Sequence, residues 1–292
     1  MKNIVIAGAG NVGICAAKSI MNSTDMVLYG FLRRREEKVP EFEDIQVRTE
    51  IDMFDKKPDG VIICVPSENV YGVEKKLLEK GINTVDAYDL HGKIYELKAG
   101  LEESAKSGNA SAIIGAGWDP GLDSTIRTLL CAAIPKGKTY TDFGPGMSMG
   151  HTATVKSIDG IENAVSITVP KGKGEHKRKV YIVLKNGEKR NDIEHEILSN
   201  EYFEHDETEI FFVDSIKDFY NTSHRVKIFH NDLGAENKQR AKFEMEIDNP
   251  SLTGEILVSA MRASFLMTSG CYFFNEVPPI YFIPNKENYE FI

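Results

Sequence analysis

The sequence has 292 residues, of which 41% are hydrophobic and 27% are charged, as in ordinary globular proteins. This length suffices for one large core or for two coupled domains. The formal net charge of −9 argues against nucleic acid or an anionic membrane surface as the main partner. The cysteines show no Cys-x-x-Cys spacing, so we expect reduced thiols in a cytoplasmic protein and no metal site: Cys15, Cys64, Cys131 and Cys271.

The N-terminus superficially resembles a bacterial export signal, with Lys2 followed by an apolar run up to Ile14. Three glycines and an asparagine interrupt this run, and their spacing has a better explanation, given below. No other run approaches the ~20 apolar residues that are needed to span a bilayer. We therefore expect neither export nor a membrane span.

Residues 1–118 alternate strand-like and helix-like segments, which predicts a parallel sheet covered by helices. The predicted strands are Asn3–Ala7, Met26–Leu32, Gly60–Val65, Asn83–Tyr88 and Ser111–Gly115. The predicted helices are Val12–Met21, Asn69–Glu79 and Ile94–Ser107. The fold class is therefore α/β, with a Rossmann-type first domain.

After residue 118 the pattern changes to alternating strands, which predicts a second domain of α+β type. The predicted strands are Ala164–Val169, Lys177–Leu184, Glu209–Val213, Arg225–Phe229 and Ala241–Ile247. The predicted helices are Asp123–Ala133, Asp192–Leu198 and Ser251–Ser269, the last packing back on the first domain. We expect one domain from residues 1–118 plus 250–292 and a substrate-binding and dimerisation domain from residues 119–249.

A glycine-rich turn between the first strand and the first helix matches the dinucleotide fingerprint G-x-G-x-x-G. Gly8 permits the tight turn, Gly10 lets the backbone approach a pyrophosphate, and Gly13 allows close packing of helix on strand. Asn11 and Val12 open the helix, whose N-terminal N–H groups favour a phosphate. The position at residue 8, within a βαβ pattern, predicts a nicotinamide dinucleotide site.

Arg33, Arg34 and Arg35 follow the second predicted strand, where an NAD enzyme usually presents an acidic residue. Guanidinium groups suit the 2′-phosphate of NADP, so we predict NADP as the cofactor. A solvated charge run is the alternative, and Glu36 and Glu37 could neutralise it or serve an NAD ribose. Three further residues, at the end of a buried strand, are predicted to lie near the nicotinamide ribose: Cys64, Pro66 and Ser67.

Candidate substrate ligands follow later strands. Asp86, Asp89 and Asp119 could hold an ammonium group, although each is also a common turn or capping residue. The glycine-rich segment Asp142–His151 is either a flexible carboxylate-binding loop or a plain interdomain loop. In the segment His176–Lys179, Arg178 could clamp a distal carboxylate or lie on an exposed strand edge. Two more residues are ambiguous: His224, which could simply be a surface histidine, and Asn249.

In these motifs the chain resembles the meso-diaminopimelate dehydrogenase family. The segments that carry the resemblance are Gly8–Gly13, Gly30–Arg35, Asp86–His91, Gly117–Gly121, Phe143–His151, Ile167–Pro170, His176–Arg178 and Asp248–Pro250. It is loosest between Glu188 and Arg240, where this chain is shorter than many members. The resemblance implies reversible oxidation of the D-configured amino carbon of meso-2,6-diaminopimelate, with NADP as hydride acceptor, by a homodimer.

The resemblance also implies roles for individual residues. Asp89 and Asp119 match carboxylates around the reacting D-centre, and either one is our hypothesis for the proton acceptor. Trp118 matches an aromatic wall beside them. The other implied substrate-binding residues are Phe143, Met149, Gly150, Thr168, Arg178, His224 and Asn249. Phe143 departs from the family, where tryptophan is frequent, so the shape of the pocket is in question.

Two other interpretations remain open from the sequence. A sister enzyme of the same fold could act on another diamino acid, such as 2,4-diaminopentanoate, whose single carboxylate makes a distal arginine unnecessary. A non-catalytic NADP-binding sensor would keep the glycine-rich turn without the polar residues beyond the sheet.

Overall fold

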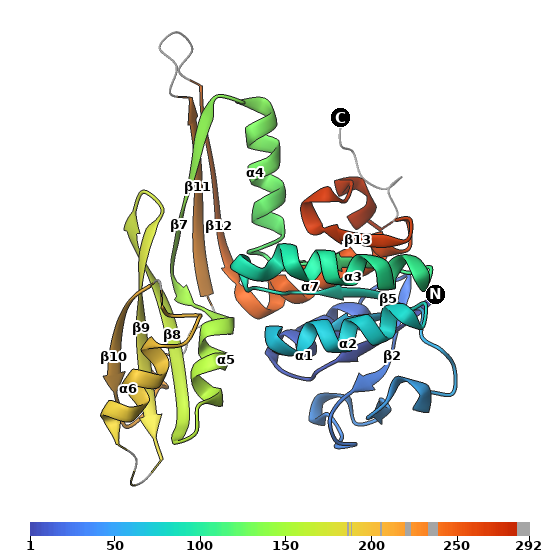
Figure 1. Ribbon diagram of the computed structural model, residues 1–292, viewed down its shortest axis with the longest axis horizontal. Helices are drawn as coiled ribbons and strands as arrows, with labels where there is room; N and C mark the ends of the chain where they lie inside the picture. Colours follow the sequence, from blue (N-terminus) through green and yellow to red (C-terminus); the bar gives the residue numbers. More distant parts are fainter. Residues whose placement is uncertain (186, 188, 205, 220–222, 233–238, 285–292) are drawn as a thin grey trace. The chain divides into compact units, whose positions relative to one another are not determined.

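The computed structural model describes residues 1–284 apart from 186, 188, 205, 220–222 and 233–238 (Figure 1). The chain divides into two compact units. The first is Met1–Thr125 together with Pro250–Ile292, and the second is Ile126–Asn249. Among the described residues, no helix is both long and apolar enough to cross a bilayer.

The first unit contains a seven-stranded parallel sheet in the order β13-β6-β5-β4-β1-β2-β3. Its strands are β1 (Lys2–Ala7), β2 (Met26–Leu32), β3 (Val47–Arg48), β4 (Gly60–Ile63), β5 (Asn83–Asp86), β6 (Ser111–Ile114) and β13 (Gly270–Phe273). Its helices are α1 (Asn11–Met21), α2 (Ser67–Glu79), α3 (Ile94–Ser107), the start of α4 (Leu122–Ala133), and α7 (Asn249–Ser264) from Pro250 onward.

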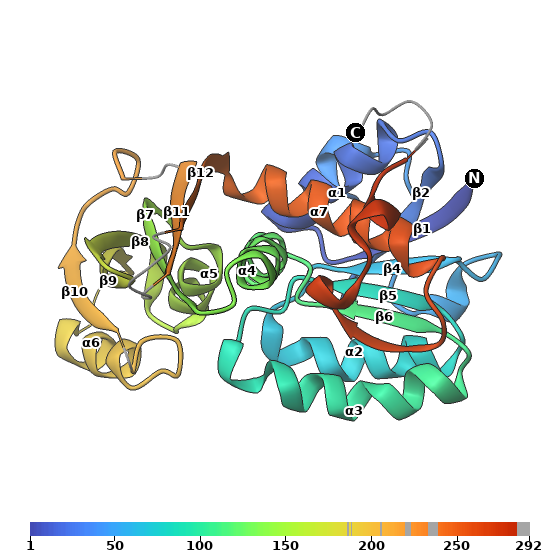
Figure 2. The same ribbon diagram turned by 90° about the horizontal axis from the view of Figure 1, so that it is seen from above.

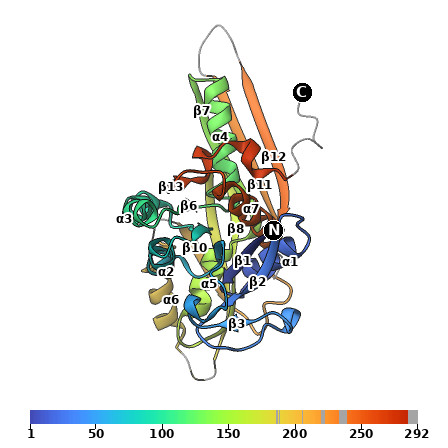
Figure 3. The ribbon, with the colours of Figure 1, turned by 90° about the vertical axis from the view of Figure 1, so that its right-hand side faces the viewer.

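Helices cover both faces of this sheet, because its central strands are apolar on both sides. Ile4, Val5 and Ile6 of β1 are fully buried, whereas an alternating strand would leave every second residue in water. The helices α2 and α3 lie on one face, and α1 and α7 lie on the other (Figures 2 and 3). The α/β class predicted from the alternating pattern is confirmed.

The helix α7 packs closely on α1 through a glycine. A Cβ atom at Gly254 would lie 2.7 Å from the backbone nitrogen of Ala16 and 2.8 Å from the carbonyl carbon of Cys15. Backbone atoms cannot move aside as a flexible side chain can, so residue 254 must lack a side chain for this contact. Ala16, which lies at this contact, and the adjacent Ala17 are fully buried.

We expect Gly254→Ala to destabilise the protein by about 1–3 kcal/mol, because the added methyl group overpacks the contact between α7 and α1. Gly72→Ala is the matched control, since a Cβ atom at this exposed helical glycine would meet nothing within 4 Å. The control should be neutral or stabilising by up to about 1 kcal/mol, from helix propensity. Urea unfolding measures both, and equal stability of the two variants would contradict the close contact.

The second unit contains a six-stranded sheet in the order β10-β9-β8-β7-β11-β12. Its strands are β7 (Gly137–Met147), β8 (Ile161–Gly172), β9 (Glu175–Leu184), β10 (Glu207–Phe212), β11 (Ser223–Asp232) and β12 (Arg240–Asp248). All neighbours are antiparallel except β9 and β10, which run parallel. The helices α5 (Met149–Ser157) and α6 (Arg190–Leu198) contribute Val155, Ile193 and Ile197 to a buried cluster with β8 and β9.

Part of the prediction for the second unit is wrong. The segment Asp142–His151, predicted as a flexible loop, instead forms the end of β7 and the first turn of α5. Its glycines hide the period-two pattern of a strand, although Gly146 pairs with residues of both neighbouring strands. The helix α5 was not predicted, because few of its residues are apolar. The helix predicted over Ser251–Ser269 is shorter, and ends at Ser264.

Candidate functional site

The glycine-rich turn of the first unit is held by close backbone contacts. Gly8 has φ = +101°, and a Cβ atom there would lie 2.4 Å from the carbonyl oxygen of Cys64. A Cβ atom at Gly13 would lie 2.4 Å from the carbonyl oxygen of Gly8. At Gly10, by contrast, a Cβ atom would meet nothing within 4 Å. Two glycines therefore serve packing, and the third leaves open space beside the start of α1.

That open space suits a phosphate group. The N-cap of α1 is Gly10, no side chain caps the helix, and its first turn, including Asn11 and Val12, has no acidic residue. The first N–H groups of a helix have no partner inside the helix, and its dipole favours an anion there. A pyrophosphate therefore fits these residues in both shape and charge.

The arginine run directly follows β2. The Arg33 backbone N–H donates to the carbonyl oxygen of Arg48 at 2.9 Å, which continues the pairing toward β3. Arg33 Nη1 donates to the carbonyl oxygen of Glu37 at 2.6 Å. The Glu37 carboxylate lies 3.8 Å from Arg33 and 3.6 Å from Arg35, whose side chain is 83% exposed. Such exposed pairs are weak, so the run remains a cationic surface.

Ser67 connects the predicted cofactor residues with the predicted substrate residues. The chain leaves β4 through Cys64, Val65 and Pro66, and Ser67 begins α2. Ser67 Oγ donates to Asp89 Oδ1 at 2.7 Å, and the Asp89 backbone N–H donates to Ser67 Oγ at 3.3 Å. Burial raises the pKa of the Cys64 thiol to about 12, so this cysteine is not a nucleophile at neutral pH.

Asp86 ties together the ends of two strands. Its Oδ1 accepts hydrogen bonds from the N–H groups of Tyr88 at 2.7 Å and Gly115 at 3.0 Å. Its backbone carbonyl accepts another from Ala116 at 2.7 Å. The segments after β5 and β6, which carry Asp89 and Asp119, are therefore joined through a single fully buried residue.

Asp86 also contacts a second fully buried carboxyl group, that of Glu74 on α2. Thr84 Oγ1 donates to Glu74 Oε1 at 2.6 Å. Two buried oxygens of this pair, Glu74 Oε2 and Asp86 Oδ2, have no hydrogen-bond partner among the described residues. Burial, and then the charge of Asp86, raises the pKa of Glu74 well above its usual range, so Glu74 is the protonated member of the pair.

Two further predicted residues lie after β6. Trp118 is buried, and Asp119 Oδ1 lies 3.9 Å from His91 Nε2. His91 was not among the predicted site residues, although it lies two residues after Asp89 in sequence. The structure thus places Asp89, Asp119 and Trp118 in the first unit. His91 joins them as a candidate site residue that the sequence did not indicate.

We expect Glu74→Gln to make the protein more stable than wild type at alkaline pH. Burial raises the pKa of Asp86 to about 6 and that of Glu74 further, so the folded protein retains a proton that the unfolded chain loses above about pH 4. The wild-type free energy of unfolding should therefore fall as pH rises from about 4 through 6, by up to about 1.4 kcal/mol per pH unit for each retained proton. The glutamine amide is uncharged at every pH, so this loss is smaller in the variant.

Urea unfolding between pH 5 and pH 8 measures this difference. Glu79→Gln is the matched control, because Glu79 lies on the same helix but is exposed. The control should follow the wild-type pH profile. Parallel profiles for the wild type and Glu74→Gln would show that the two buried carboxyl groups share no proton.

The second unit places four residues in one row across neighbouring strands. Arg178 of β9 is opposite Thr168 of β8, Thr168 is opposite Gly146 of β7, and Gly146 is opposite His224 of β11. Directly opposite residues point to the same face of a sheet. The row therefore brings together three predicted ligands, Arg178, Thr168 and His224, that are separated by up to 56 positions in sequence.

Gly146 belongs in this row because it has no side chain. A Cβ atom there would lie 2.6 Å from both Cα and Cγ of His224. His224 is 2% exposed, so the alternative of a surface histidine is wrong. Its Nδ1 lies 2.9 Å from the carbonyl oxygen of Arg225, and burial lowers its pKa to about 4. At neutral pH, His224 is an uncharged hydrogen-bonding group.

The remaining predicted ligands surround this row. Asn249 is buried, and its Nδ2 donates to the carbonyl oxygen of Met147 at 3.4 Å. The Phe143 ring meets the edge of the His176 ring at 6.1 Å between centroids. Met149 and Gly150 begin α5, directly after β7. All seven residues that were predicted to bind substrate after position 140 therefore lie in the second unit.

An unpredicted acidic residue, Asp206, contacts the row. Its Oδ2 accepts a hydrogen bond from Arg178 Nε at 2.5 Å. His176 Nε2 lies 3.4 Å from its Oδ1, and His151 Nε2 lies 3.6 Å from its Oδ2. Asp206 falls where the resemblance is loosest, between α6 and β10, so no motif in the sequence marks it.

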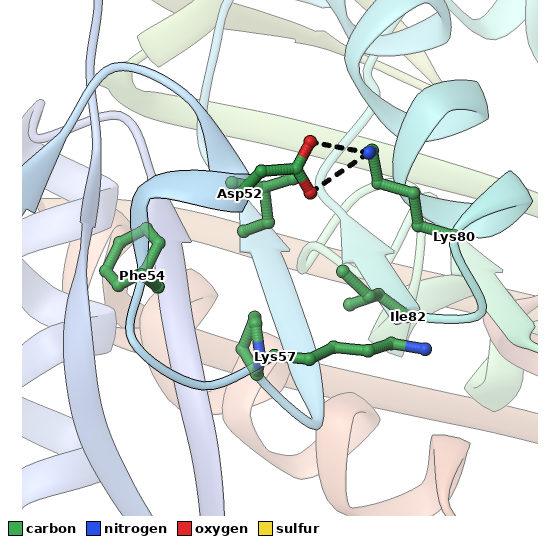
Figure 4. A pocket seen from close by; sticks show the side chains of 7 residues that line it. Asp52, Phe54, Lys57, Lys80 and Ile82 are labelled. Carbon is green, nitrogen blue, oxygen red and sulfur yellow. Dashed lines mark hydrogen bonds and ion pairs between the residues drawn. The ribbon is translucent and has the colours of Figure 1, made fainter.

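A separate pocket opens at the opposite edge of the first sheet (Figure 4). It holds about 380 Å³ and is lined by Ile51, Asp52, Phe54, Lys57, Pro58, Lys80 and Ile82. Lys57 and Lys80 precede β4 and β5, whereas Gly8 and Asp89 follow the carboxyl ends of β1 and β5. Lys80 Nζ pairs with Asp52 Oδ2 at 2.7 Å. None of the predicted site residues lines this pocket, and the described residues include no cluster suited to a metal ion.

Comparison with known proteins divides the chain in much the same way as its two compact units. Residues 2–86 match the oxidoreductase family with an NAD-binding Rossmann fold, and residues 117–249 match the diaminopimelic acid dehydrogenase C-terminal domain. The meso-diaminopimelate D-dehydrogenase of Bacteroides fragilis is 42% identical over 282 residues, which cover 96% of this chain and 94% of that protein. The chain belongs to the meso-diaminopimelate D-dehydrogenase family.

Other members of the family and of the fold are also similar. The meso-diaminopimelate D-dehydrogenase of Lysinibacillus sphaericus is 29% identical, covering 89% of this chain and 87% of that protein. The crystal structure of C. glutamicum diaminopimelate dehydrogenase in complex with diaminopimelate has a TM-score of 0.87 at 26% identity, covering 98% of this chain and 97% of that one. An engineered D-amino acid dehydrogenase bound to NADP+ shares the fold, with a TM-score of 0.89, 24% identity and coverage of 97% and 96%.

Family membership confirms the resemblance that was drawn from the motifs. The chain is an oxidoreductase of the amino-acid dehydrogenase type, and its first unit carries an NAD(P)-binding Rossmann domain. The glycine-rich turn is the part of that domain whose geometry fits the cofactor.

Proposed function

We propose that this chain catalyses reversible oxidative deamination at the D-centre of meso-2,6-diaminopimelate, with NADP as the hydride acceptor. The products are L-2-amino-6-oxopimelate and ammonia. Within the family, the observation that carries the proposal is the row Arg178, Thr168, Gly146 and His224. It offers a guanidinium, a hydroxyl and an uncharged imidazole, which suit a carboxylate far from the reacting carbon.

The substrate carries two amino and two carboxylate groups, so its binding site requires both signs of charge. Asp89 and Asp119 supply two carboxylates for the ammonium group at the D-centre, and Trp118 supplies an apolar wall. Phe143, Met149 and Gly150 of the second unit are proposed as further substrate-binding residues. Thr168, Arg178, His224 and Asn249 are proposed to hold the distal L-centre. Fixed points of opposite charge select one stereocentre by orienting the molecule.

Oxidation of an amino carbon requires that the amine first lose a proton. Asp89 and Asp119 are the proposed acceptors, directly or through water. Asp89 accepts a hydrogen bond from Ser67, which holds one of its oxygens in place. Removal of hydride from the carbon is the chemistry that the nicotinamide supplies when bound, while the protein supplies orientation and charge.

Two features support NADP over NAD. The strand β2 is followed by no acidic residue until Glu36, and Arg34 and Arg35 are exposed beside it. Glu37 pairs with Arg33 and Arg35 and so compensates only part of the positive charge. A 2′-phosphate would form charge-assisted hydrogen bonds with the remaining guanidinium groups.

We also propose that the protein is a cytoplasmic homodimer formed through the second unit. The described cysteines are all free thiols, which suits a reducing compartment.

We expect the purified protein to reduce NADP in the presence of meso-2,6-diaminopimelate at alkaline pH, monitored by the absorbance of the reduced nicotinamide. The L,L isomer is the control and should give no turnover, because it lacks a D-configured amino carbon. Turnover of 2,4-diaminopentanoate instead would identify the sister enzyme. No turnover with any diamino acid and either cofactor would leave the NADP-binding sensor.

We expect the double variant Arg34→Ala/Arg35→Ala to raise KM for NADP by about tenfold or more, while KM for NAD changes by less than about twofold. The reason is that only NADP carries the 2′-phosphate. Lys38→Ala is the control, since it removes a nearby exposed charge and should leave the ratio of the two KM values unchanged. Equal changes for both cofactors would contradict a specific phosphate contact.

A further inference from the structure

We propose that Asp206 is a positioning residue that fixes the guanidinium of Arg178 for the distal carboxylate of the substrate, and so contributes to substrate specificity. This inference rests on the proposed function. It adds a residue that neither the motifs nor the resemblance identified, and it assigns that residue a physical task.

The strand pairing brings Asp206 to Arg178. Asp206 directly precedes β10, and β10 pairs with β9 so that Thr208 is opposite Arg178. The carboxylate approaches the guanidinium from the side, through Nε at 2.5 Å. The side chains of Arg178 and Asp206 are 11% and 19% exposed, so the pair is far better shielded than the surface ion pairs of this protein.

The Arg178 guanidinium is held on more than one side. Nη1 donates to Thr168 Oγ1, and Nη2 lies 3.3 Å from His176 Nε2. With Asp206 on Nε, hydrogen bonds at two of the three nitrogens define the plane of the group. A guanidinium that is already fixed loses little conformational entropy when a carboxylate binds its terminal nitrogens. The contact with Thr168 also keeps it in the row that includes Gly146 and His224.

The electrostatics agree with a permanent charge on Asp206. Although burial opposes it, hydrogen bonds from His151, His176 and Arg178 hold the pKa of Asp206 well below its usual range. Ser148 Oγ lies 2.8 Å from Nδ1 of His151, which orients that ring toward Asp206. Asp206 is therefore ionised throughout the working range of pH and compensates the charge of Arg178. Affinity for the distal carboxylate then comes from directed hydrogen bonds more than from excess positive charge.

The kinetic test is a double-mutant cycle with meso-2,6-diaminopimelate as the varied substrate. Asp206→Ala should raise KM by about fivefold or more with kcat within about twofold, because the affected contact is remote from the reacting carbon. Arg178→Ala should raise KM by about tenfold or more. The double variant should be no worse than Arg178→Ala, because Asp206 acts through that arginine.

Matched controls separate positioning from general damage. Glu207→Ala removes the neighbouring carboxylate, which pairs with Lys171 at 2.7 Å on the surface, and should leave KM unchanged. Asp206→Asn keeps the shape of the side chain, so it should fold and show an intermediate KM. D-lysine equals the substrate without its distal carboxylate, and its kcat/KM should be the same in wild type and Asp206→Asn.

A measurement on the substrate-free protein tests the role of Asp206 independently of the proposed function. The Arg178 Nε–H resonance, assigned by its loss in Arg178→Ala, should be protected from water exchange in wild type and unprotected in Asp206→Ala. Persistence of this protection would overturn the positioning role, as would an unchanged or lowered KM, or multiplicative effects in the cycle. If wild type fails to oxidise meso-2,6-diaminopimelate, the proposed function fails while the resonance still decides whether Asp206 fixes Arg178.

Discussion

The buried carboxylate of Asp86 is the constraint on which the reactive side of the first unit depends. Parallel strands end in segments whose N–H groups have no sheet partner, and one side-chain oxygen here accepts two of them, from Tyr88 and Gly115. These hydrogen bonds fix the start of the segments that carry Asp89 and Asp119. The neutral Glu74 beneath Asp86 makes this possible, because two ionised carboxylates in a dry interior would repel each other.

In the second unit, the candidate site residues are positioned by the register of paired strands. In the first unit, they are positioned by the segments that follow the strand ends. Antiparallel pairing places Arg178, Thr168 and His224 in one row, although His224 comes from a different hairpin than Thr168 and Arg178. The absence of a side chain at Gly146 is as important as the polar groups, since it leaves room for the His224 ring. The chemistry of the row thus follows from pairing geometry, and any shift by one residue would send these side chains to the other face.

The sequence predicted the first unit well, because glycine spacing and buried apolar strands are local signals. Gly8, Gly10 and Gly13 have distinct packing surroundings that agree with the roles inferred from their spacing. The end of β7 could not be predicted in the same way, since its glycines are explained only by neighbouring strands. Burial of His224 and the contact of Asp206 with Arg178 also arise from pairing between distant strands. Neither leaves a pattern within a window of a few residues.

The return of the chain to the first unit has a consequence for its synthesis. The ribosome delivers β1 to β6 long before α7 and β13, which complete the same sheet and cover α1. Ala16, whose backbone nitrogen lies against Gly254, therefore stays uncovered by α7 while more than a hundred residues of the second unit emerge. The second unit is continuous in sequence, so all strands of its sheet are synthesised before β13 completes the sheet of the first unit. The first unit is thus complete only after α7 and β13 have emerged.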